Sequence, residues 1–145
     1  MKKNIQKEDI KFLIKGIELL DSNIIYPKAP LTAEVTFKFN INVEIKTINE
    51  QNLIMAIVSA DILDNKTLDK YGFIRVNCIF HVENFISFIN SETKKVEFPK
   101  QFLTTINSIS LSTTRGIMYD QFRGTFLNGA ILPILDPTFL EKNLK

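Results

Sequence analysis

Residues 35–46 read VTFKFNINVEIK, and apolar and polar side chains alternate along the whole segment. A period of two predicts a β-strand with one apolar and one polar face, because successive side chains of a strand point to opposite sides. This is the clearest secondary-structure signal in the chain, and the rest of the predicted fold is arranged around it. The apolar positions are Val35, Phe37, Phe39, Ile41, Val43 and Ile45.

Three more strands are predicted around this segment. Residues 10–20 are dense in apolar side chains, and we interpret them as a strand with a bulge or kink at Gly16, followed by a loop over residues 21–30. Residues 53–63 are apolar on both faces in their first half, which is typical of a strand covered on both sides. Residues 71–82 alternate again. Because polar turns separate these segments, we predict a four-stranded antiparallel meander.

One long helix is predicted in the C-terminal half, from Pro99 to Phe122, after a short helical turn over residues 85–89. Proline suits the first helical position, where no N–H is required. Serines and threonines crowd the middle of this helix, and Gly116 follows them, so another helix can approach closely. The alternative is a helix that breaks near Gly116, since glycine is a poor helix former.

The segment after this helix is too apolar for a mere linker. We predict that Gly124 caps the helix in a left-handed conformation, that residues 125–135 are extended, and that Asp136-Pro137 begins a short C-terminal helix. The predicted fold class is therefore α+β, with the long helix packed on one face of the sheet. The length of 145 residues fits a single domain over residues 1–145.

Composition and charge exclude several classes of protein. Apolar residues make up 45% of the chain and charged residues 23%, which is typical of a globular protein and not of a disordered one. The formal net charge of +2 is too small to predict a nucleic-acid partner. No apolar run is long enough to predict membrane insertion, and no secretory signal is recognisable. A single cysteine, Cys78, agrees with a reducing compartment, so we expect a cytoplasmic protein.

The sequence predicts no catalytic, metal or cofactor site. Cys78 and His81 lie three residues apart in a predicted strand and therefore point to opposite faces. The common nucleotide-binding and nucleophile motifs are absent from the sequence. Arg115 and Arg123 are interpreted as structural residues that pair with an acid or cap carbonyl groups, and an unrecognised enzyme using both with Asp120 is the alternative. We expect a non-enzyme whose surplus apolar surface forms an oligomer interface or a binding groove.

Residues 123–126 read RGTF, and Leu132-Pro133-Ile134 follow after a short apolar segment. Placed after four strands and a long helix, these residues resemble the SecB family of export chaperones, over about residues 10–144. RGTF alone is a weak motif, and the resemblance rests on the motif, its spacing to the proline and the strand order together. The segments 114–116 and 136–137, TRG and DP, are more similar to the divergent SecB-like branch.

The resemblance implies an ATP-independent holdase without a cofactor, which holds unfolded polypeptides such as preproteins for export in long apolar grooves. It also implies a homotetramer, a dimer of dimers with the long helices packed between two sheets. The implied interface residues are Ser108, Ser112, Thr113 and Gly116. The implied client-binding residues are Phe37, Phe39, Ile41, Val43, Ile45, Phe126, Ile131, Leu132 and Ile134. For the strand residues among them, the alternative is that they face the covering helix as core.

Two partners stay open at this point. Founding members of the family are strongly acidic, and that charge serves docking to the SecA motor, whereas this chain carries a formal charge of +2. Divergent SecB-like proteins include chaperones that guard the antitoxin of a toxin–antitoxin system. The alternative function is therefore a dedicated chaperone for one partner such as an antitoxin.

Overall fold

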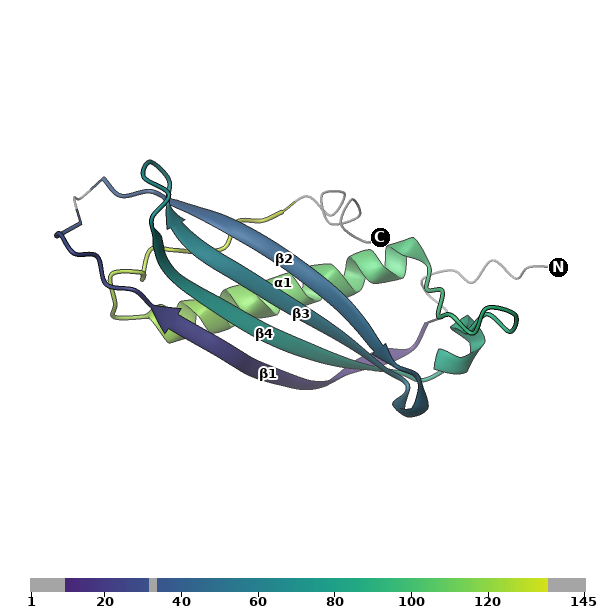
Figure 1. Cartoon of the computed structure of the whole chain (residues 1–145). Helices are drawn as coiled ribbons and strands as arrows, with labels where there is room; N and C mark the ends of the chain where they lie inside the picture. The colour runs from purple at the N-terminus through teal and green to yellow at the C-terminus, as the bar shows by residue number, and fades with distance from the viewer. Residues whose placement is uncertain (1–9, 32–33, 136–145) are drawn as a thin grey trace.

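The computed structural model describes residues 10–31 and 34–135, which form one antiparallel sheet and one long helix (Figure 1). The prediction of an α+β fold with four strands and a long helix is confirmed. The predicted C-terminal helix begins at residue 136 and lies outside the described residues. The elements are β1 (Phe12–Ile24), β2 (Phe37–Ile48), β3 (Leu53–Asp64), β4 (Lys70–Val82) and α1 (Lys100–Phe122), with short 3₁₀ turns η2 (Asn49–Gln51) and η3 (Phe85–Phe88).

The prediction of a simple meander is wrong, because the strands lie in the order β1-β4-β3-β2. Strands β2, β3 and β4 are joined by tight turns and do form a meander. Strand β1 instead pairs with β4, with Phe12 opposite Val82 and Ile24 opposite Gly72. The connection over residues 25–36 is long enough to cross the end of the sheet, and this places β1 and β2 at opposite edges (Figure 1).

Strand β1 is longer and more irregular than its neighbours. The predicted bulge at Gly16 is confirmed by a register shift between Ile14 and Gly16, and a second shift follows between Leu19 and Asp21. The predicted loop over residues 21–30 begins too early, because Asp21 to Ile24 continue the pairing with β4. Polar residues such as Asp21 and Asn23 suggested a loop, because the sequence does not show that β4 pairs with them.

The core lies between α1 and the two central strands. Alternate residues of β3 and β4 are fully buried on the face that α1 covers, as the period-two pattern predicts. From the helix, Phe102, Ile106, Met118 and Phe122 fill the space above them. Because α1 runs obliquely across the sheet, it leaves the first half of β2 uncovered, and residues 130–135 run there instead (Figure 1).

The predicted bounds of the long helix are confirmed within one residue, with Pro99 at the N-cap position. The helix is continuous through Gly116, so the alternative of a break there is wrong. Two of its hydroxyl residues, Ser110 and Thr114, are fully buried against the sheet. Each donates a hydrogen bond to the main-chain carbonyl four residues earlier, at 2.7 and 2.8 Å. The small side chains thus allow close approach to the sheet without leaving a buried hydroxyl unpaired.

Gly124 has a φ of +79°, which confirms the predicted left-handed residue after the helix. The prediction of an extended segment over residues 125–135 is wrong in its first half, because residues 125–129 form turns. The Thr125 hydroxyl donates to the Phe122 carbonyl at 2.7 Å and accepts from the Leu127 N–H at 3.1 Å. This local pairing folds the chain back, so that Leu127 and Ala130 enter the core.

Candidate functional site

The helix-facing side chains of β2 are less buried than those of the strand beside it. Ile41 lies opposite Ala60 and Val43 opposite Val58, so these residues share the face that α1 covers elsewhere. Ala60 and Val58 are fully buried, whereas Ile41 and Val43 are only half-buried. The predicted strand residues therefore face the helix side, as core residues would, and are still partly exposed, as groove residues would be. The row comprises Phe37, Phe39, Ile41, Val43 and Ile45.

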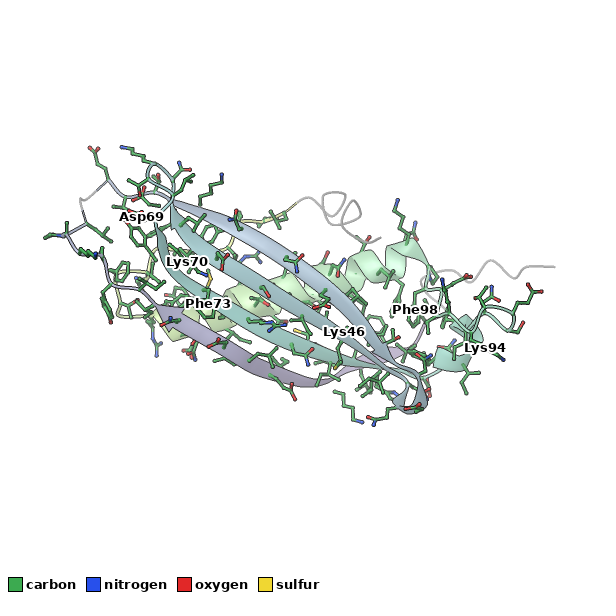
Figure 2. All side chains as sticks on the ribbon, viewed as in Figure 1. Lys46, Asp69, Lys70, Phe73, Lys94 and Phe98 are labelled. Carbon is green, nitrogen blue, oxygen red and sulfur yellow. The ribbon has the colours of Figure 1, made fainter. Side chains whose placement is uncertain are left out.

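Two hollows follow one another along this row. The first has a volume of about 340 Å³, and residues 37–41 of β2 form one side of it, with Pro133 and Leu135 on the other. The second has a volume of about 740 Å³ and lies where β2 passes Val96, Phe98 and Leu103. Figure 2 labels Phe98 and Lys94 near this end of the sheet. We call the two hollows and the β2 row between them the β2 groove.

Arg115 holds the wall of the first hollow in place. Its Nε donates to the Leu132 carbonyl at 2.7 Å, and one terminal nitrogen donates to the Pro133 carbonyl at 2.9 Å. The segment that carries Pro133 and Leu135 is thereby fastened to the middle of α1. Sequence reasoning left the roles of both arginines open, and the structure assigns Arg115 to the carbonyl-binding alternative.

The predicted wall residues between Ile131 and Ile134 do not share one environment. Leu132 is 2% exposed and belongs to the core, so a client cannot reach it in this conformation. Ile131 is 52% exposed and Ile134 is 91% exposed, and both point away from the protein core. The wall of the groove is formed by Pro133 and Leu135, which sequence reasoning did not select although they alternate with the selected residues.

Phe126 lies at the end of the sheet, apart from the β2 groove. Its ring packs on Tyr26 with centroids 5.6 Å apart and on Tyr71 at 5.8 Å. Tyr71 in turn contacts Phe37, at 6.5 Å between centroids. A hollow of about 580 Å³ lies between residues 26–31 and 124–126. An aromatic row thus leads from the exposed Tyr26, which sequence reasoning missed as a site residue, to the first residue of the groove.

One buried polar side chain of α1 lies on the helix stripe between Leu103, which lines the larger hollow, and Leu111. Asn107 of α1 is fully buried, and neither its Nδ2 nor its Oδ1 has a hydrogen-bond partner among the residues that the structure describes. A buried amide without a partner costs about 1–3 kcal/mol per group in proteins. Sequence reasoning missed this residue, although its spacing gave a signal: it stands four residues from both Leu103 and Leu111, in an apolar stripe.

Three of the four predicted interface residues lie on the side of α1 turned away from the sheet, whereas the Thr113 hydroxyl lies beside the Cys78 thiol of β4. Ser108, Ser112 and Gly116 are exposed, and Thr113 is half-buried. A Cβ added at Gly116 would meet no atom within 4 Å. Small residues on an exposed helix face leave room for a second helix. The structure of the single chain therefore does not block the predicted helix interface.

The other candidate chemical groups are not assembled into a site. Cys78 is fully buried on the helix side, where burial raises the pKa of its thiol, and His81 lies half-buried on the opposite face. Arg123 pairs with Asp120 at 3.8 Å on the surface, whereas Arg115 binds main-chain carbonyls. Within residues 10–31 and 34–135, no three His, Cys, Asp or Glu side chains gather as a metal site. No helix in this part of the chain is long and apolar enough to span a membrane.

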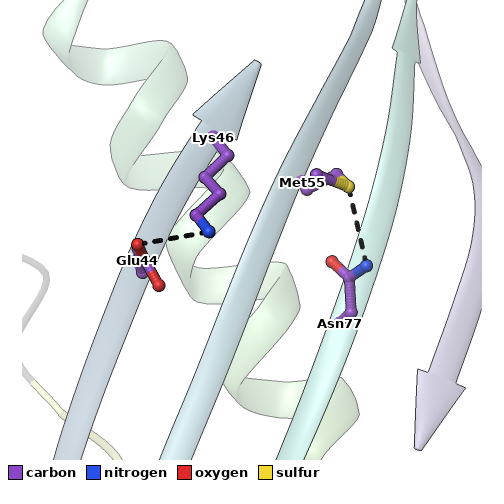
Figure 3. Close-up of polar contacts among 4 residues, drawn as sticks. All are labelled: Glu44, Lys46, Met55 and Asn77. Atoms are coloured by element: carbon purple, nitrogen blue, oxygen red, sulfur yellow. Dashed lines mark hydrogen bonds and ion pairs between the residues drawn. The ribbon is translucent and has the colours of Figure 1, made fainter. Parts of the chain in front are cut away.

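The sheet face turned away from α1 carries charges of both signs. Lys46 lies 3.6 Å from Glu44, and the Asn77 amide donates to the Met55 sulfur at 3.7 Å (Figure 3). Lys70 pairs with Asp61 at 3.1 Å on the same face. This face is therefore not a strongly acidic surface of the kind that the resemblance associates with docking to the SecA motor.

The chain is similar to known proteins in structure, whereas the sequence comparisons found no match. No protein-family model matches the chain, and no curated protein matches it. A SecB-like chaperone from Mycobacterium tuberculosis, solved in complex with a ChAD peptide from the HigA1 antitoxin, superposes with a TM-score of 0.61 and 15% identity. That match covers 86% of this chain and 90% of the other. A protein of unknown function from Streptococcus agalactiae matches with a TM-score of 0.40 and 8% identity, over 78% of this chain and 88% of the other.

The similarity to the mycobacterial chaperone extends over nearly the whole chain, and it agrees with the order of strands and helix described above. The resemblance first drawn from RGTF and the following proline is thus confirmed at the level of the fold. The chain has the fold of the SecB-like chaperones.

Proposed function

We propose that the protein is an ATP-independent holdase that binds unfolded polypeptide segments in the β2 groove. The observation that carries this proposal is the half-exposed apolar row of β2, whose first half α1 leaves uncovered in a chain of SecB-like fold. Strand β2 also lies at an edge of the sheet, where an extended polypeptide can run alongside it. Holding a polypeptide requires no bond chemistry, and this agrees with the scattered candidate chemical groups.

The groove binds clients through apolar contacts of low specificity. The rings of Phe37 and Phe39 bury a large area on any apolar client side chain, whatever its exact shape. Apolar burial contributes roughly 25 cal/mol per Å², so one short segment is held only weakly. A homotetramer with four such grooves on one flexible client raises the affinity through effective concentration. The tetramer, with α1 at its interface, is part of the proposal.

The proposal also covers the clients of the protein and its place of action. Unfolded preproteins awaiting export are the proposed clients, and the proposed place of action is the cytoplasm. Docking to the SecA motor would have to use another surface or another charge pattern, because the outer sheet face carries both Lys46 and Glu44, and both Lys70 and Asp61. Motor docking is therefore a less favoured part of this proposal.

The test is suppression of aggregation. α-Lactalbumin unfolds and aggregates when its disulfides are reduced, and light scattering follows this directly. We expect stoichiometric protein to suppress the scattering without ATP. Phe39→Ser should weaken the suppression roughly tenfold in the concentration required, because a buried aromatic contact is lost.

Asn40→Ser is the matched control, since Asn40 is adjacent in β2 and points to the other face. Both variants are first compared by urea unfolding, so that a loss of fold is not mistaken for a loss of binding. Equal aggregation with and without the wild-type protein would refute the proposed function.

A second candidate function is a dedicated chaperone for one partner. It is favoured by the mycobacterial structure, in which a protein of the same fold is bound to an antitoxin peptide. In this case the groove binds one sequence far more tightly than others. Competition between unfolded α-lactalbumin and proteins captured from the native host distinguishes the two: a single captured protein that displaces α-lactalbumin at much lower concentration supports the dedicated role.

A further inference from the structure

We infer that Asn107 is an anchor for the client main chain, pairing its side-chain amide with one peptide group of a polypeptide bound in the β2 groove. The inference rests on the proposed function and adds a specific residue and a specific chemical group of the client. It starts from the two unpartnered polar atoms of a fully buried side chain, among the residues that the structure describes.

The position of Asn107 on α1 places it beneath the groove. Leu103, four residues before it, lines the larger hollow. Leu111, four residues after it, forms a small cluster with Val58, against which Ile41, Val43 and Leu135 pack. Residues four apart lie on the same face of a helix, so Asn107 lies between these two leucines and faces β2. It therefore lies at the junction of the two hollows.

The chemistry of the site matches a peptide group. A primary amide offers both a donor and an acceptor, and a peptide group offers one of each in return. The neighbours named above are leucine, isoleucine and valine, which offer no hydrogen-bonding side chain. The larger hollow also has polar lining residues, but neither polar atom of Asn107 is hydrogen-bonded to any of them; they are Asn42, Glu44, Thr47, Asn49, Lys94 and Lys95. An extended client segment presents the missing donor and acceptor whatever its side chains are.

Access to Asn107 requires a rearrangement of β2 side chains. The amide is covered in the free chain, whereas Val43 and Ile45 above it are only half-buried. Side chains with one face in solvent change rotamer on the picosecond to nanosecond scale, so a client can displace them. A client with apolar side chains replaces the lost contacts while its main chain reaches Asn107. The anchor then fixes the register of a segment that apolar contacts alone leave free to slide.

The test compares folding stability with client affinity in Asn107→Leu. Leucine has the same number and branching of side-chain heavy atoms as asparagine and no polar atoms, so the variant should be as stable as the wild type or more stable in urea unfolding. Affinity is measured by fluorescence anisotropy with fluorescein-labelled peptides of about ten residues, the reach of one strand such as β2, tiled across α-lactalbumin. We expect the tightest-binding peptide to bind the variant roughly five- to tenfold more weakly.

The combination of higher stability with weaker binding is what a purely structural asparagine would not produce. Asn40→Leu, on the other face of β2, is the matched control and should leave the affinity unchanged. Unchanged affinity in Asn107→Leu, with the wild type binding normally, overturns this inference and leaves the proposed function intact. Absence of peptide binding by the wild type overturns both.

A second measurement uses the wild-type protein alone, in case the variant does not fold. The same peptide is methylated at one main-chain nitrogen at a time, which removes one donor without changing the side chains. We expect a single position at which methylation weakens binding roughly tenfold, and, where Asn107→Leu folds, no effect of that methyl group on the variant. Methylation that weakens binding equally at all positions, or at none, overturns the inference.

Discussion

Arg115 connects the helix to the groove at the scale of a single residue. Its planar guanidinium binds two successive carbonyl groups, of Leu132 and Pro133, that lie 17 and 18 residues further along the chain. Those carbonyls belong to a segment without regular secondary structure, which has few other main-chain partners in the described part of the chain. Arg115 therefore helps to hold Pro133 and Leu135 beside β2, together with the buried side chain of Leu132.

We predict that Arg115→Met destabilises the protein by about 1–3 kcal/mol, because it removes two hydrogen bonds from a charged donor while keeping the apolar part of the side chain. It should also weaken peptide binding, since one wall of the groove is released. Urea unfolding and fluorescence anisotropy measure the two effects. Arg123→Met is the control, because its exposed ion pair with Asp120 contributes only about 0–1 kcal/mol. Equal losses in both variants would contradict the role given to Arg115.

Asp64 stabilises the turn between β3 and β4 in a way that depends on pH. Its carboxylate accepts hydrogen bonds from the main-chain N–H groups of Thr67 at 3.0 Å and Lys66 at 2.8 Å, and from the Tyr71 hydroxyl at 3.0 Å. These bonds, those to the main chain first, hold its pKa below the ordinary value of 3.8. A lowered pKa in the folded state means that the carboxylate stabilises the fold above its unfolded pKa.

We predict that the wild-type free energy of unfolding falls as the pH drops below about 4 and on through the lowered pKa of Asp64. Asp64→Asn removes the titrating group, so this part of the pH dependence should disappear, together with some stability at neutral pH. Urea unfolding at a series of pH values, for wild type and variant, gives the comparison. Two parallel profiles would show that another group is responsible.

Residue roles were the least predictable part of the site. Sequence reasoning could place Arg115 and Arg123 beside the same segment, but it could not assign their partners, because the carbonyls that Arg115 binds carry no signature in the sequence. Leu132 and Pro133 are adjacent, yet the first enters the core and the second lines the groove, and the sequence does not show which of the two is buried. Asn107 was detectable from its spacing, yet polarity alone suggested an outward position.

At the scale of elements, α1 separates two surfaces with different tasks. One side packs on the sheet and limits the β2 groove, and the other side carries the exposed Ser108, Ser112 and Gly116. Glycine inside a helix costs about 1 kcal/mol relative to alanine. Such a cost is tolerated where another chain requires a close approach, and the proposed tetramer interface supplies a reason for it.

We predict that Gly116→Ala stabilises the single chain by up to about 1 kcal/mol and weakens its self-association. The first effect follows from helix propensity, because the added Cβ meets nothing within 4 Å. The second follows from the methyl group that a packed helix would meet. Urea unfolding at several protein concentrations and sedimentation velocity separate the two effects.

Gly129→Ala is the control, since Gly129 lies outside the helix and also has no neighbour within 4 Å of an added Cβ. Unchanged association in Gly116→Ala, with the wild type forming tetramers, would remove Gly116 from the interface.

Element boundaries followed closely from periodicity, whereas strand order did not. The alternation in β2, the continuous apolar run in β3 and the proline before α1 predicted each element within a few residues. An alternating pattern shows which side chains share one face of a strand, but it does not show which strands are neighbours in the sheet. The pairing of β1 with β4 could not be read from the predicted loop over residues 21–30, which carries no signal for the strand that follows it in space.

At the scale of the whole molecule, β1 leaves an apolar edge uncovered. Leu13, Ile14, Ile17, Leu19 and Leu20 are between 41% and 58% exposed along this edge strand. A long apolar edge invites pairing with another chain, and stable proteins cover or charge such edges. We propose that the exposed face of α1 and the β1 edge are the two separate self-association surfaces of the proposed dimer of dimers.

We predict a tetramer in sedimentation equilibrium at micromolar concentration. Ile17→Lys places a charge on the β1 edge and should shift the species toward dimers, because charged side chains block edge-to-edge pairing. Ile86→Lys is the control and should leave the tetramer intact, because this isoleucine is 74% exposed in the turn η3, against 48% for Ile17, and lies outside the β1 edge. A wild-type protein that stays monomeric at this concentration would refute the assembly.

The order of strands in the sheet also has a consequence for synthesis on the ribosome. Strand β1 is made first, but Phe12 must wait for Val82, its partner in β4, to be translated. At 5–20 residues per second this delay lasts roughly 3 to 14 s, during which Phe12 has no partner strand. The nascent chain of this proposed holdase therefore passes through a stage in which it presents an unpaired apolar strand of its own, the kind of segment that an existing copy is proposed to bind.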